Sequence, residues 1–153
     1  MRILAIDPGP ETSAWLIWDG QRVEGACGEC SNDALLQDVI GRSVIPFDVL
    51  VIEKVACMGM AVGAEVFETV FWSGRFAQVA EANGKPWHRL TRHQVKMHLC
   101  GSMQAKDANI RQSLIDKLGK PGVKKAPGPT YGVSGHLWSA LAVAITWQEK
   151  SIC

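Results

Sequence analysis

The stretch that decides the fold is residues 2–13, which read RILAIDPGPETS. An apolar run with the character of a β-strand ends in one carboxylate, Asp7, and Pro8 and Gly9 stop the strand directly after it. A second apolar strand follows over residues 14–18. A buried strand that ends in a carboxylate beside a tight turn holds that side chain rigidly, as a metal ligand must be held. Aspartate is also an ordinary turn residue, so this stretch alone leaves both roles open.

The composition is that of one globular domain covering residues 1–153. Hydrophobic residues make up 47% of the chain and charged residues 20%, and a chain of this length buries a core without disulfides or metals. No apolar run in the sequence approaches the roughly 18 residues of a membrane span, and no secretory signal precedes the first strand. We therefore expect a soluble intracellular protein with no membrane partner.

The cysteines do not suggest a disulfide framework. Five is an odd number, and their spacing fits a protein from a reducing compartment. Cys27 and Cys30 match the C-x-x-C pattern of half a zinc site or a redox pair, but no second pair accompanies them. The sequence therefore disfavours a zinc or redox role for these two residues.

The net charge of +1 conceals a strong segregation of charge along the chain. Residues 1–84 contain five Lys and Arg against twelve Asp and Glu, whereas residues 85–125 contain ten against two, a local net charge of +8. Such a basic segment is either a solvated surface or a binding surface for a phosphate backbone beside an acidic, cation-binding half. The lopsided separation favours the second interpretation.

The apolar pattern predicts an α/β domain. Strands are expected over residues 3–6, 14–18, 22–27, 47–53 and 85–90, the first three as an antiparallel meander. Helices are expected over residues 32–41, 61–83, 92–99, 105–118 and 135–150, with loops over 54–60 and 119–135. The aromatic residues of the 61–83 helix indicate either cover by a second subunit or simple core packing.

The strand at 47–53 is continuously apolar and closes on Glu53, which is typical of a central strand covered on both faces. Two central strands ending in Asp7 and Glu53 bring two carboxylates to one edge of a sheet. These carboxylates repel each other unless cations lie between them. Mg²⁺ suits such a site, because it binds through one or two carboxylates and keeps waters that a phosphate can displace. A pair of such ions can hold both reacting oxygens of a phosphodiester.

At this point the sequence resembles the RuvC-type Holliday junction resolvases of the RNase H-like superfamily. Ile6-Asp7-Pro8-Gly9 is similar to the opening of these proteins, and further similar elements follow in the same order at 51–55, 74–75, 92–96, 105–108 and 139–144. The resemblance implies an RNase H-like fold, with a central mixed five-stranded sheet of an antiparallel meander plus parallel strands, flanked by helices.

The resemblance also implies a function. It implies a Mg²⁺-dependent, structure-specific endonuclease, for which Mn²⁺ can substitute, that acts as a homodimer and cuts branched DNA by two-metal hydrolysis. Four-way (Holliday) junctions are the expected substrates, and flaps are a further possibility. A short chain with divergent motifs favours a phage-type branch, in the cytoplasm of a bacterial cell or a phage-infected host.

Carried over residue by residue, the resemblance makes Asp7, Glu53 and His136 the metal ligands and Lys106 a lysine that supports catalysis. A lysine near the scissile phosphate is physically sensible, because negative charge builds up there during displacement. The expected DNA-binding residues are Arg92, Lys96, Lys106, Arg111, Lys124 and Lys125.

The sequence departs from the family's pattern at two places. The last helix of the family carries two metal ligands one turn apart, and here the second is Ser139, a poor Mg²⁺ ligand, while His136 occupies the first. Either His136 suffices, or the site is a weakened one, or the protein binds junctions and cuts them slowly. After Glu53 the family often places an aromatic wedge. Here Met58 or Met60 can serve as an apolar substitute, and packing explains these methionines equally well.

Two other functions compete with the nuclease. A catalytically weakened protein that binds branched DNA would retain the basic surface and the dimer, and Ser139 favours it. A fragment of an actin-like ATPase or sugar kinase would also begin with a strand, an aspartate and a glycine. Those folds need two such domains around the nucleotide, however, and 153 residues are too few.

Overall fold

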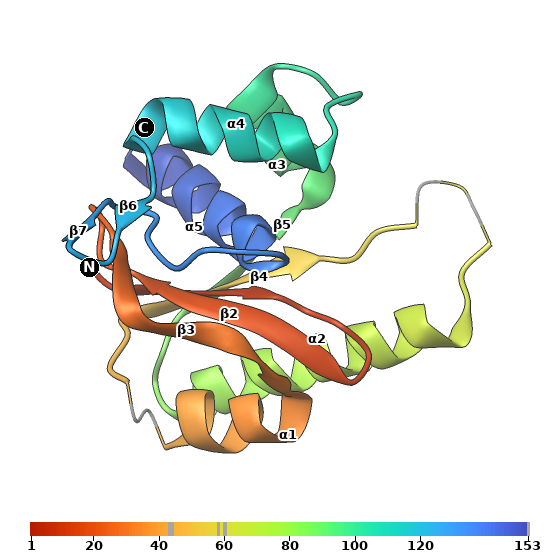
Figure 1. Cartoon of the computed structure of the whole chain (residues 1–153). Coiled ribbons are helices and arrows are strands. Elements are labelled where there is room, and N and C mark those ends of the chain that lie inside the picture. The colour runs from red at the N-terminus through yellow and green to blue at the C-terminus, as the bar shows by residue number, and fades with distance from the viewer. Residues whose placement is uncertain (43–44, 58, 60, 153) are drawn as a thin grey trace.

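The computed structural model describes residues 1–42, 45–57, 59 and 61–152, and its centre is a five-stranded sheet in the order β3-β2-β1-β4-β5 (Figure 1). Its strands are β1 (Ile3–Asp7), β2 (Thr12–Trp18), β3 (Val23–Ser31), β4 (Val49–Lys54) and β5 (Trp87–Thr91). β1, β2 and β3 form the antiparallel meander, while β4 pairs in parallel with both β1 and β5. The predicted mixed sheet is confirmed.

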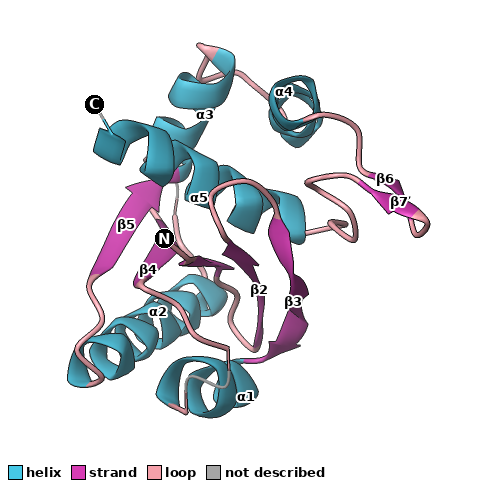
Figure 2. Cartoon of the chain, turned by 90° about the vertical axis from the view of Figure 1, so that its left-hand side faces the viewer, coloured by secondary structure: helices cyan, strands magenta, loops and turns pink. Residues whose placement is uncertain are grey.

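Helices cover both faces of this sheet (Figure 2). They are α1 (Asn32–Ala34), which continues into the π-helical turns η1 (Leu35–Gly41), α2 (Ala64–Ala82), α3 (Arg92–Cys100), α4 (Asp107–Leu118) and α5 (Leu137–Ile152). The predicted loop at 119–135 contains a small hairpin of β6 (Gly122–Val123) and β7 (Ala126–Pro127). In the part of the chain that the structure describes, no helix combines the length and apolarity needed to cross a membrane.

The two central strands separate two hydrophobic cores. In β1, Ile3 and Ala5 pack toward α5, whereas Leu4 and Ile6 pack toward α2 and η1. Residues 49–52 of β4 alternate in the same way, and all of these side chains are almost fully buried. Burial on both faces explains why these strands are continuously apolar rather than alternating.

The helix predicted over residues 32–41 differs from expectation in its winding. Its last turns are π-helical, and the backbone amide of Arg42 donates to the carbonyl of Gln37, five residues back. A Cβ atom on Gly41 would lie only 2.9 Å from the carbonyl oxygen of Leu36. Glycine at this position therefore permits the wide turn, and a simple 3.6-residue pattern does not reveal it.

The two cysteines of the C-x-x-C pattern do not face each other. Cys27 packs against the core below α5, and Cys30 packs against the core below α2, so the two thiols lie on opposite faces of β3. Both cysteines are free, and burial raises the pKa of both thiols. Successive side chains of a strand point to opposite faces, so two residues three positions apart lie on opposite faces.

A buried polar network fixes the turn between β1 and β2, just after Asp7. The Ser13 hydroxyl accepts from the Gly9 amide at 3.2 Å and donates to the Asn32 side-chain oxygen at 2.6 Å. The Asn32 side-chain nitrogen then donates to the Gly9 carbonyl at 3.0 Å. Ser13 and Asn32 are each only 1% exposed. This closed network ties the turn to the start of α1 and holds the end of β1 in place.

Replacing Ser13 with alanine should therefore destabilise the protein by about 1–3 kcal/mol, because two buried groups lose their partner. The neighbouring Thr12→Ala variant is the matched control. Thr12 is exposed, and among the described residues its hydroxyl bonds the Glu29 carboxylate alone, at 3.1 Å, so its loss should cost no more than about 0.5 kcal/mol. Urea denaturation measures both values, and equal losses would contradict the importance of the network.

Candidate active site

The strand register brings two carboxylates together at one edge of the sheet. Ile6 of β1 lies opposite Ile52 of β4, so Asp7 and Glu53, the next residue in each strand, reach the same edge. Glu53 in turn lies opposite Leu90 of β5, and α3 begins two residues later. The side chain of Asp7 is 17% exposed and that of Glu53 12%. The predicted pair of acids is thus present, half-enclosed at the carboxyl ends of β1 and β4.

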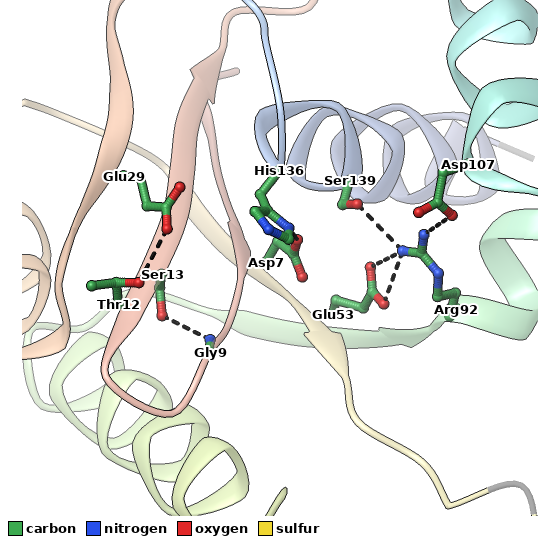
Figure 3. Close-up of polar contacts among 10 residues, drawn as sticks. All are labelled: Asp7, Gly9, Thr12, Ser13, Glu29, Glu53, Arg92, Asp107, His136 and Ser139. Atoms are coloured by element: carbon green, nitrogen blue, oxygen red, sulfur yellow. Dashed lines mark hydrogen bonds and ion pairs between the residues drawn. The ribbon is translucent and has the colours of Figure 1, made fainter. Parts of the chain in front are cut away.

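His136 approaches Asp7 from the start of α5. Its backbone carbonyl accepts from the amides of Ser139 and Ala140, so His136 caps this helix. Its imidazole Nδ1 meanwhile lies 3.4 Å from Asp7 Oδ2, and the side chain is 73% exposed (Figure 3). The main chain of His136 thus bonds the first turn of α5, while its side chain lies beside the carboxylate of Asp7.

Arg92, the first residue of α3, lies within the acidic edge. Its Nη1 donates to both oxygens of Glu53, at 3.3 and 3.2 Å, and to the Ser139 hydroxyl at 3.3 Å. Its Nη2 donates to Asp107 at the start of α4 (Figure 3). One guanidinium therefore links two carboxylates and a hydroxyl that come from β4, α4 and α5.

Burial and crowding of the carboxylates perturb their proton affinities. Burial raises the pKa of Asp7. The charges of His136 and Arg92 and hydrogen bonds from His136 and Ser139 lower this pKa, but burial outweighs them. Burial and the nearby charge of Asp7 raise the pKa of Glu53 to about 7, although Arg92 acts in the opposite direction. Burial lowers the pKa of Arg92, but Glu53 and Asp107 outweigh it, and the net shift is upward. Such perturbation is typical of functional sites.

The donor atoms suit one hard cation better than two. Asp7 and His136 offer an oxygen and a nitrogen on one side, and Glu53 can add an oxygen. Within the described residues, however, no three His, Cys, Asp or Glu side chains are gathered closely enough to hold a metal ion. Glu53 bonds Arg92, and Ser139 brings a hydroxyl where another carboxylate was expected.

Two adjoining cavities open on either side of Arg92. One, of about 470 Å³, is lined by Asp7, Glu53 and Lys96 among others. The other, of about 700 Å³, is lined by Asp107, His136, Ser139 and Arg111 among others. Lys96 thus lines the same cavity as the two carboxylates, and its DNA contact stays a prediction. Arg111 lies 5.2 Å from the ring centre of Trp138 in the neighbouring cavity.

The other predicted DNA-binding lysines lie at different distances from this edge. Lys106 is exposed and directly precedes Asp107 at the start of α4. Lys124 and Lys125 form the turn of the β6–β7 hairpin. Pro129, just after β7, accepts from the Val23 amide at the start of β3, so the hairpin joins the sheet at the end away from Asp7 (Figure 1). Met58 and Met60 lie outside the described residues.

Sequence reasoning missed Asp107 and the contacts of Arg92 within the chain. Arg92, predicted to bind DNA, bonds Glu53 and Asp107 in this structure. A signal for its position was present. Thr91 and Gln94 form a capping box that begins α3 directly after β5, and parallel strands end at the same edge of a sheet. Asp107 had no comparable signal, because a loop joins α3 to α4.

The raised pKa of Glu53 predicts a measurable effect on the metal-free protein. Because the folded state binds this proton more tightly than the unfolded chain, stability should fall as pH rises from about 4.5 to about 7. Glu53→Gln should therefore stabilise the metal-free protein at pH 8, by about 1–3 kcal/mol. Thermal and urea denaturation across pH measure this gain.

Glu149→Gln is the contrasting control. Burial raises the pKa of Glu149, but hydrogen bonds and charges of Lys117 and His98 outweigh it and lower the pKa overall. Its carboxylate therefore stabilises the fold, and removing the charge should destabilise the protein at pH 8. A Glu53→Gln protein that is no more stable than the wild type at pH 8 would contradict the electrostatic strain at the acidic edge.

Comparisons with known proteins bear on the fold. No family model matches the chain, and no curated protein matches it either. Among solved structures, RuvC of Thermus thermophilus matches with a TM-score of 0.72 and 20% identity, over 99% of this chain and 96% of that one. The T. thermophilus RuvC structure in complex with a Holliday junction substrate matches with a TM-score of 0.70 and 19% identity, over 99% and 94%. The chain therefore has the fold of RuvC, as the motifs in its sequence predicted.

Proposed function

We propose that this chain is a divalent-metal-dependent endonuclease that cuts branched DNA such as Holliday junctions. The observation that carries the proposal is the pair of half-buried carboxylates, Asp7 and Glu53, at the adjacent ends of β1 and β4. The imidazole of His136 lies beside the Asp7 carboxylate. This edge lies in a chain with the RuvC fold, and one of the two RuvC structures above holds a Holliday junction substrate. The cytoplasm of a bacterial cell or phage-infected host is the compartment that suits this function.

In the proposed reaction each residue has a physical role. Asp7 and His136 would hold a divalent cation, Mg²⁺ or Mn²⁺, and Glu53 could add an oxygen ligand. Such an ion, when bound, would lower the pKa of a coordinated water and stabilise charge on the phosphate. Lys96, in the same cavity as the carboxylates, and the exposed Lys106 draw the DNA backbone toward this edge. The second ion of the predicted two-metal mechanism would need a ligand other than the neutral Ser139.

A homodimer is part of the same proposal. On α2, the side chains of Phe67, Val70 and Phe71 are 65%, 50% and 60% exposed. Large apolar side chains gathered on one helix are unfavourable in water and mark a surface for a partner. A second copy of the chain would bury them, and it would place two acidic edges on one branched DNA.

The alternative function is a protein that binds branched DNA and cuts it poorly. Ser139 and the engagement of Glu53 by Arg92 favour it, because both reduce the donors available to metal. Both functions require the basic residues around the two cavities, so DNA binding does not distinguish them. The rate of DNA cleavage does.

Cleavage of a labelled four-way junction, with linear duplex as the reference substrate, tests the proposed activity. Cutting of the junction is expected with Mg²⁺ or Mn²⁺ and not with EDTA. Asp7→Asn should lower the rate by roughly 100-fold or more, because it removes a charged ligand. Asp19→Asn is the matched control and should retain activity, since Asp19 lies in the turn between β2 and β3, where its carboxylate accepts from the amides of Gln21 and Arg22.

Metal-dependent cutting lost in Asp7→Asn but not in Asp19→Asn would support the nuclease. Tight binding of the junction without cutting would favour the binding protein instead. A protein that neither binds nor cuts the junction would contradict both functions.

The dimer is tested by light scattering during gel filtration. The wild-type chain should elute with the mass of two chains, and Phe71→Glu should shift it to one, because a buried carboxylate at an apolar interface is strongly unfavourable. Gln78→Glu adds the same charge at another exposed position of α2 and should leave the mass unchanged. A wild-type monomer, or a Phe71→Glu dimer, would contradict an interface on this face.

A further inference from the structure

Arg92 places a positive charge against two carboxylates of the acidic edge, those of Glu53 and Asp107. Its Nη1 lies 3.3 and 3.2 Å from the two oxygens of Glu53, a geometry in which one positive group serves both oxygens of the carboxylate. The same nitrogen reaches the Ser139 hydroxyl, and Nη2 reaches Asp107. Three side chains, those of Glu53, Ser139 and Asp107, are thus gathered around one guanidinium, on the side of the edge away from His136 (Figure 3).

Charge balance at the edge points in the same direction. Asp7, Glu53 and Asp107 carry three negative charges when ionised, and Arg92 contributes one positive charge. The remainder is −2, which a single divalent cation cancels with His136 neutral. A second divalent cation would leave the edge at +2, and Ser139 supplies no carboxylate to compensate it.

We infer that the Arg92 guanidinium takes the place of a second divalent cation, so that each chain binds one metal ion, at Asp7 and His136. This inference rests on the proposed nuclease function and assigns Arg92 a role in that site. A guanidinium is planar, permanently charged and rich in donors, so it can stabilise negative charge on a phosphate as a metal does. It cannot, however, generate a nucleophilic water, and that task remains with the one ion.

The same arrangement gives Ser139 and Asp107 a role. A carboxylate at 139 would form a further strong pair with Arg92 or complete a second metal site, whereas a hydroxyl only accepts one hydrogen bond from Nη1. Asp107 holds Nη2 from the far side, so the guanidinium is fixed by α4 as well as by β4. Asp107 is therefore a positioning residue for Arg92.

Manganese binding tests the inference directly. Mn²⁺ titration, with electron paramagnetic resonance of the bound ion, should give one uncoupled ion per wild-type chain, alone and on a four-way junction with phosphorothioate linkages. Two ions in one site lie only about 3.5–4 Å apart and give a spin-coupled spectrum. The double variant Arg92→Gln, Ser139→Asp should bind two coupled ions. Arg92→Lys should retain one, because it keeps the charge.

The control is Arg42→Gln, which removes an arginine from an exposed ion pair with Asp38 and should leave the metal count unchanged. Circular dichroism establishes that each variant is folded. A spin-coupled pair in the wild-type protein would overturn the role of Arg92 and leave the nuclease intact, as would a folded double variant that still binds one ion. A wild-type protein that binds no Mn²⁺ and cuts no junction would overturn both the inference and the proposed function.

Discussion

The parallel pairing of β1 with β4 buries two strands from both sides and, because Ile6 lies opposite Ile52, brings Asp7 and Glu53 to one edge of the sheet. The rest of the site depends on this register. A slip of one residue would turn each apolar side chain to the other core and separate the two carboxylates. The packing that stabilises the domain therefore also positions its acidic groups, with the Ser13–Asn32 network holding the turn after Asp7.

Placing these carboxylates together is electrostatically unfavourable in the absence of a cation. Burial and mutual repulsion raise the pKa of Glu53 to about 7, which is free energy that cation binding can recover. Arg92 already offsets part of this unfavourable free energy, because its charge and hydrogen bonds stabilise the ionised form of Glu53. The remaining charge lies around Asp7, the carboxylate that His136 approaches. The two halves of the edge thus differ: Arg92 contacts the carboxylate of one half, and the other half is where we propose that a metal ion binds.

Much of the fold could be predicted from the sequence, because apolar periodicity and strand ends are local signals. The continuous apolar runs before Asp7 and Glu53 indicated buried strands, and the structure confirms both. The role of Arg92 could not be predicted, since it depends on Asp107, which comes from a helix packed beside α3 and α5. The winding of η1 and the β6–β7 hairpin were also missed. Both depend on glycines at which other backbone atoms come too close to leave room for a Cβ atom.

The most direct test of the account is anomalous diffraction from crystals of the protein grown with Mn²⁺. The account predicts a manganese peak at the carboxyl ends of β1 and β4, within about 2.0–2.3 Å of a carboxylate oxygen of Asp7 and a ring nitrogen of His136. The Arg92 guanidinium should remain on Glu53. Crystals that bind Mn²⁺ only elsewhere, with this edge empty, would contradict the claim that the paired strand ends form a metal-dependent active site.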